Sequence, residues 1–66
     1  MRHTEKWYQR RLAKYFTEHY IGYEDAVEYL TDPAPNVWQC IIHEEKIKLT
    51  LVCDDRGQVH EKREPI

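Results

Sequence analysis

Large apolar residues alternate with polar or small ones along residues 37–59, and this is the period of a strand with one buried face. The alternation predicts two strands, Val37–His43 and Lys46–Asp54, joined by a turn at Glu44 and Glu45. A β-hairpin is therefore the first element that the sequence predicts.

The turn sets the register of this hairpin. It pairs Val37 with Val52 and Ile42 with Ile47, and it places seven apolar side chains on one face. They are Trp38, Cys40, Ile42, Ile47, Leu49, Leu51 and Cys53. A shift of one residue would scatter them over both faces, so the register is strongly specified.

A second turn follows at residues 54–57, where Asp54 takes the first position and Gly57 the fourth. This composition is typical of a type I turn with a G1 bulge. It pairs Cys53 with Val59 and so begins a third strand. Residues 61–66 are mostly charged and include a proline, and we expect them to form a blunted edge or a frayed tail.

The first third of the chain has helical periodicity. Over Thr4–Ile21, apolar and aromatic residues recur every three or four positions, with Thr4 as N-cap and Gly22 as stop signal. A second helix is predicted over Tyr23–Thr31, or as a continuation of the first through a kink at Gly22. It ends before Pro33, because the residue before a proline is driven out of helical geometry.

Together these elements predict one α+β domain over residues 1–66. Its two N-terminal helices would pack on one face of a three-stranded antiparallel β-meander, giving two layers. A chain of 66 residues buries only about 60% of its unfolded surface, so its core is marginal. Two tryptophans, five tyrosines and one phenylalanine compensate with large buried areas.

The two cysteines are predicted to be free thiols. In the hairpin register they lie about 13 Å apart along the strands, beyond the reach of a disulfide. Cys40, His43, Cys53 and His60 have spacings similar to those of a zinc site. The register places the thiols on one face and the imidazoles on the other, so we expect no metal and no cofactor.

Charge and hydropathy narrow the class of protein. A third of the residues are charged but the net charge is only −2, which argues against a general nucleic-acid binder. Residues 1–6 contain no apolar run, and no run approaches the ~20 residues that cross a bilayer. We therefore expect a cytoplasmic protein without a membrane partner.

The favoured function is binding of another protein. Val37, Ile41 and Val52 fall on the sheet face turned away from the helices, where they form an apolar patch with a polar rim. Trp7 and Arg11 are residue types common at interface hot spots. We expect a small non-catalytic binding or regulatory module that docks on a partner protein or on itself as a homodimer, although scattered surface aliphatic residues are also ordinary.

A nucleic-acid-binding module is the alternative. Residues 1–22 carry five Lys or Arg against two acids. A basic face with an embedded aromatic ring can hold phosphates while it stacks a base. The residues of this face are Lys6, Trp7, Arg10, Arg11 and Lys14.

A small histidine-dependent ribonuclease is the third hypothesis. His43 or His60 would combine with Lys46, Lys48 or a tyrosine, which together would supply the acid, the base and the phosphate clamp. The predicted register does not bring the two histidines together, so enzymatic activity is not expected.

Overall fold

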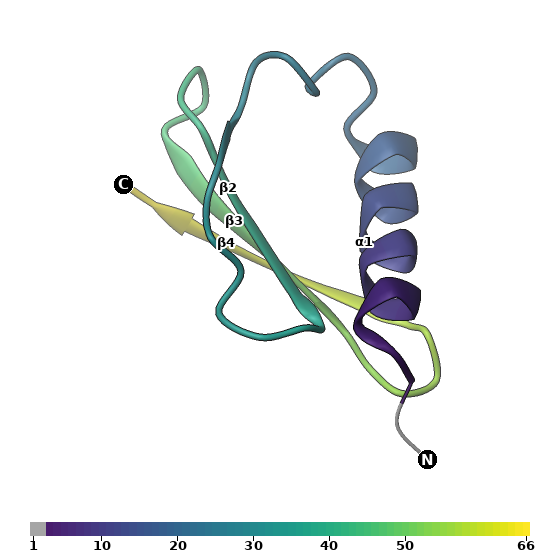
Figure 1. The fold of residues 1–66 in the computed structure, drawn as a ribbon. Coiled ribbons are helices and arrows are strands. Elements are labelled where there is room, and N and C mark those ends of the chain that lie inside the picture. Colours follow the sequence, from purple (N-terminus) through teal and green to yellow (C-terminus); the bar gives the residue numbers. More distant parts are fainter. Residues whose placement is uncertain (1–2) are drawn as a thin grey trace.

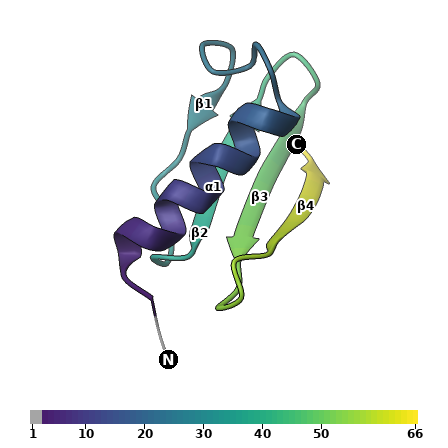
Figure 2. The ribbon, with the colours of Figure 1, turned by 90° about the vertical axis from the view of Figure 1, so that its right-hand side faces the viewer.

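The computed structural model describes residues 3–66, which form one helix and one antiparallel sheet of four strands (Figure 1). In chain order the elements are α1 (Glu5–His19), β1 (Glu28–Tyr29), β2 (Val37–Ile42), β3 (Ile47–Cys53) and β4 (Val59–Pro65). The strands are neighbours in that same order, and α1 lies across one face of the sheet (Figure 2). The predicted α+β class is confirmed, whereas two helices and three strands were expected.

Helix α1 begins and ends where its capping residues require. The Thr4 side chain accepts a hydrogen bond from the backbone N–H of Trp7 at 3.2 Å, as an N-cap does. At the other end the N–H of Tyr20 donates to the Phe16 carbonyl at 2.8 Å. Gly22 then leaves the helix direction with a φ of +85°.

The core lies between α1 and the sheet face that it covers. The helix contributes a line of residues spaced by four, and the strands contribute the alternating positions predicted from the sequence. The buried residues are Tyr8, Leu12, Phe16, Tyr20, Cys40, Ile42, Leu49, Leu51 and Cys53. Trp38, Ile47 and Val59 are partly buried against them. The predicted assignment of the strand residues to the inner face is therefore confirmed.

Both hairpins have the predicted register. β2 pairs with β3 from Val37–Val52 to Ile42–Ile47, around a turn at residues 43–46. In the second hairpin Cys53 pairs with Val59, and Gly57 takes the left-handed φ of +88° that the G1 bulge requires.

The second helix predicted over Tyr23–Thr31 is wrong. Turns occupy residues 21–27, and β1 then pairs with the edge of β2. A nine-residue segment is too short to hold a helix without extensive packing. The open edge of β2 instead offers backbone partners: Leu30 N–H donates to the Gln39 carbonyl at 3.0 Å. Val27 and Tyr29 are residue types that suit a strand.

Residues 61–65 form an edge strand rather than a frayed tail. β4 is paired along its whole length, as far as Ile47–Pro65, and the N–H of Ile66 donates to the Lys46 carbonyl at 3.1 Å. Because ladder bonds alternate along an antiparallel pair, the nitrogen of Pro65 faces away from β3. The proline therefore removes no hydrogen bond from the sheet.

The two glycines provide a matched pair for testing the packing of the second turn. Gly22→Ala meets nothing within 4 Å and should cost about 1–2 kcal/mol, for the left-handed backbone alone. Gly57→Ala should cost somewhat more, because its Cβ would displace the flexible Arg11 guanidinium and so break its bond to the Gly57 carbonyl. Urea unfolding measures both losses. The excess at Gly57 should vanish in an Arg11→Ala background, and equal losses for the two variants would contradict the close approach.

Candidate functional site

The candidate interface is the outer face, the side of the sheet that α1 does not cover. Val37 and Val52 are direct cross-strand partners, and Ile41 lies on the same side of β2. All three are partly exposed, and no other element of residues 3–66 packs over them. The structure thus brings together the three sheet residues predicted for the interface.

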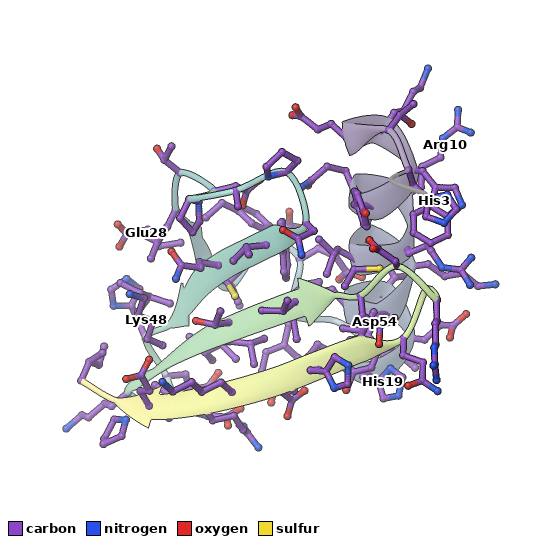
Figure 3. All side chains as sticks on the ribbon, turned by 90° about the horizontal axis from the view of Figure 1, so that it is seen from below. His3, Arg10, His19, Glu28, Lys48 and Asp54 are labelled. Atoms are coloured by element: carbon purple, nitrogen blue, oxygen red, sulfur yellow. The ribbon has the colours of Figure 1, made fainter. Side chains whose placement is uncertain are left out.

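Polar side chains lie between and beside these three apolar residues. Gln39 and Thr50 are cross-strand neighbours, and the Gln39 amide donates to the Thr50 hydroxyl at 3.4 Å. Lys48 pairs with Ile41 across the strands. Figure 3 places Lys48 and Glu28 on the side of the molecule opposite His3 and Arg10. The polar pair Gln39/Thr50 thus lies between the two valines and Ile41, so the outer face mixes apolar and polar side chains along β2 and β3.

Two histidine–carboxylate pairs mark opposite ends of the outer face. Nε2 of His43 lies 2.7 Å from Glu28 Oε1, beside the turn between β2 and β3. Nε2 of His60 lies 3.0 Å from Asp54 Oδ2, beside the turn between β3 and β4. The structure does not bring the two histidines together.

Trp7 and Arg11 lie apart from the outer face, on the helix side of the molecule. Trp7 is half-buried against the core, and its indole stacks on His3 with ring centroids 3.5 Å apart. The Arg11 guanidinium lies 4.8 Å from the centre of the same indole, while its Nε donates to the Gly57 carbonyl at 3.2 Å. These five predicted interface residues therefore do not form one surface.

The predicted nucleic-acid face is only partly presented. Lys6, Arg10 and Lys14 are exposed at four-residue spacing along α1, and Lys14 lies 4.0 Å from Glu18. The Trp7 ring is already in contact with His3, which precedes the helix, and with Arg11, one helical turn after it. The stripe could hold phosphates, but Trp7 is poorly placed to stack on a base.

The thiols of Cys40 and Cys53 are free and buried on the inner face. Burial raises the pKa of Cys40 to about 11, which disfavours the thiolate that a metal or an electrophile would need. Within residues 3–66 no group of three or more histidine, cysteine and carboxylate side chains is arranged to hold a metal ion.

The turn between β3 and β4 is fastened to α1 at its N-terminal end. The hydroxyl of Tyr8 donates to the Asp55 side chain, and Nε2 of His3 lies 3.0 Å from the Asp55 carbonyl oxygen. A hollow of about 500 Å³ lies beside these contacts, bordered on its other side by Pro35 and Asn36. Sequence reasoning did not find this junction, because it depends on residues about fifty positions apart.

Sequence reasoning made no use of an acidic stretch of the chain, in which Glu24, Asp25, Glu28 and Asp32 flank β1. Between Lys14 and Lys46 the chain has no lysine or arginine, yet it contains seven acids. They are Glu18, Glu24, Asp25, Glu28, Asp32, Glu44 and Glu45. The uneven distribution of charge along the chain was the signal that could have revealed it.

Asp54 should make the stability of the second turn depend on pH. Its carboxylate is bonded by His60 and by the backbone N–H groups of Gln58 and Arg56, and these bonds hold its pKa below the usual range. A depressed folded-state pKa adds stability above the unfolded pKa of about 3.9, and the addition is lost as the pH falls. Melting temperatures between pH 6 and 2 should therefore fall more steeply for the wild type than for Asp54→Asn. Parallel curves would contradict this role.

Comparison of the chain with protein-family models, with curated proteins and with solved structures finds no match. The one helix in residues 3–66 is neither long nor apolar enough to span a membrane. The function must therefore be argued from the geometry of the surfaces described above.

Proposed function

We propose that the protein is a non-catalytic binding module that forms a homodimer through the outer face of its sheet. The observation that supports this is the one-sided core: α1 packs on one face, and the apolar residues Val37, Ile41 and Val52 remain on the other. Pairing two such faces would convert each two-layer protein into half of a four-layer assembly. It would also supplement the marginal core of a 66-residue chain.

The outer face can complement itself under two-fold symmetry. In this arrangement the two copies are related by a two-fold axis that lies in the interface, runs perpendicular to the strands and is level with Gln39 and Thr50. Val37 would then face Ile41 of the second copy, and the Lys48 stem would cover Val52. His60 would face Glu64, an attractive pair. Lys62 would meet its own copy only at the rim, where water screens the repulsion.

The size of the face indicates a weak dimer. Three strands about 4.8 Å apart and about 20 Å long, with the two-residue β1 beside them, give a projected area of about 300 Å² per protomer. The total of about 600 Å² lies below the range of stable specific interfaces and in that of weak, transient contacts. We therefore expect reversible association that depends on concentration rather than a permanent dimer.

Ile41→Glu should abolish the dimer without unfolding the protein. The substitution places a carboxylate opposite Val37 of the second copy, where pairing would bury it against an apolar side chain. Light-scattering mass at several concentrations should change from a monomer–dimer equilibrium to a monomer, with an unchanged circular dichroism spectrum. Thr17→Glu, on the exposed side of α1, is the matched control and should behave like the wild type. A wild type that is monomeric at every concentration would refute the proposal.

A second candidate function is electrostatic binding of single-stranded nucleic acid along α1. The observation that favours it is the exposed row of Lys6, Arg10 and Lys14, whose regular spacing can follow a phosphate backbone. The packing of Trp7 against His3 limits this candidate to phosphate contacts without base stacking.

Replacing all three basic residues by glutamine tests this candidate. Anisotropy of a labelled oligo(U) should show salt-dependent binding to the wild type. The slope of log K against log salt should fall by about 2 in the triple variant, as for three lost contacts to a single strand. Lys62→Gln, on β4, is the control and should change little. Binding that is absent at low salt would eliminate this candidate.

A further inference from the structure

The two edges of the sheet differ in how they are protected. β4 forms one edge and β1 the other (Figure 2). Along β4 five consecutive titratable residues, 60–64, are followed by Pro65. Glu61 and Arg63 point to the helix side, where Glu61 accepts a hydrogen bond from Tyr15 and Arg63 donates to Glu45. Inward charges and an edge proline are the usual means of preventing strand addition.

The β1 edge lacks this protection. Leu30 and Glu28 use their backbone groups to bind β2, so ladder alternation turns the N–H and C=O of Tyr29 toward the open side. The Tyr29 side chain is 51% exposed, and its ring lies 5.5 Å from that of Trp38. The neighbouring positions of the same parity, Val27 and Thr31, carry no charge.

The charge around this edge is strongly negative. Glu24, Asp25, Glu28 and Asp32 all lie within four residues of β1. Glu28 is paired with His43, whereas the other three make no ion pair with any residue of the described range 3–66. The edge therefore combines unpaired backbone groups, an exposed aromatic ring and a negative field.

We propose that an extended segment of a partner protein, rich in lysine and arginine, adds to β1 as a fifth strand. Its backbone bonds the N–H and C=O of Tyr29, and a basic side chain lies over the Tyr29 and Trp38 rings. Other basic side chains lie against the acids on either side. The negative charge around β1 favours a lysine- and arginine-rich segment as the added strand. A second copy of β4 is disfavoured, because its own Glu61 and Pro65 oppose strand addition. The site is separate from the outer face, so the two proposals stand or fall independently.

The probe is a fluorescein-labelled nine-residue peptide in which lysine and valine alternate, compared with a peptide in which glutamate replaces lysine. Anisotropy should show that the lysine peptide binds and that added salt weakens it, because the attraction is screened. Hydrogen exchange should locate it by slowing the amide of Tyr29 while those of Glu61 and Arg63 stay unchanged.

Two substitutions of one residue separate the backbone contribution from that of the ring. Tyr29→Val removes the ring but keeps the N–H, whereas Tyr29→Pro removes both and spares the bonds to β2. The proline variant should bind about tenfold more weakly than the valine variant, as expected for one lost hydrogen bond. If circular dichroism shows that the proline variant is unfolded, the double variant Glu24→Gln/Asp25→Asn provides the test instead. It should bind the lysine peptide more weakly, and its affinity should depend less on salt.

Several results would overturn the proposal. One is that the lysine peptide does not bind, or that the glutamate peptide binds equally well. Another is that hydrogen exchange slows at Glu61 and Arg63 and not at Tyr29. A third is that the folded proline and valine variants bind the peptide with equal affinity. Unchanged binding by the Glu24→Gln/Asp25→Asn protein would do the same.

Discussion

A single helix is too narrow to cover a four-stranded sheet, and most features of this protein follow from that mismatch. A helix with its side chains is about 10 Å across, whereas four strands at about 4.8 Å spacing extend much farther. Helix α1 packs on β2, β3 and β4, and its three buried residues, with the C-cap Tyr20, seal the centre of the inner face. The flanks depend on large side chains such as Tyr15 and Trp38, which are only half-buried.

The two hairpins were predictable because their information is local. The alternation of apolar and polar residues assigned each residue of β2 and β3 to a face of the sheet. The turn residues set the pairing register of both hairpins. Strand β1 was not predictable, since two residues show no period. Its existence depends on the free edge of β2, which the sequence of residues 23–31 does not contain. Tyr23, Val27 and Leu30 have a spacing compatible with a helix, and the tertiary partner overrides it.

The same distinction applies to the candidate sites. Val37, Ile41 and Val52 were placed on the outer face by parity alone, and the structure agrees on their position. The environment of Trp7 could not be deduced in this way. It follows from the docking of the second turn on α1, where Arg11 bonds Gly57 and contacts the indole. Helical spacing placed Trp7 beside Arg11, but only the fold shows that the ring already has partners.

The distribution of charge gives the molecule two unlike ends. Helix α1 presents Lys6 and Arg10 near its N-terminus, while the sector around β1 is acidic. Complementary patches on one chain carry a risk of head-to-tail association, which does not close and leads to filaments. Strand β4, the other edge of the sheet, would be the donor to β1 in such a chain.

The side chains of β4 oppose that outcome. Glu61 and Arg63 are engaged with Tyr15 and Glu45 on the helix side, so a strand added along β4 would have to disturb both contacts. Pro65 provides no N–H at the open edge. A dimer formed by two outer faces under two-fold symmetry is closed and adds no further copies. Because β4 is protected, β1 is the one sheet edge within residues 3–66 that is open to an added strand. The asymmetry of the edges thus allows binding of an extended partner without polymerisation of the sheet.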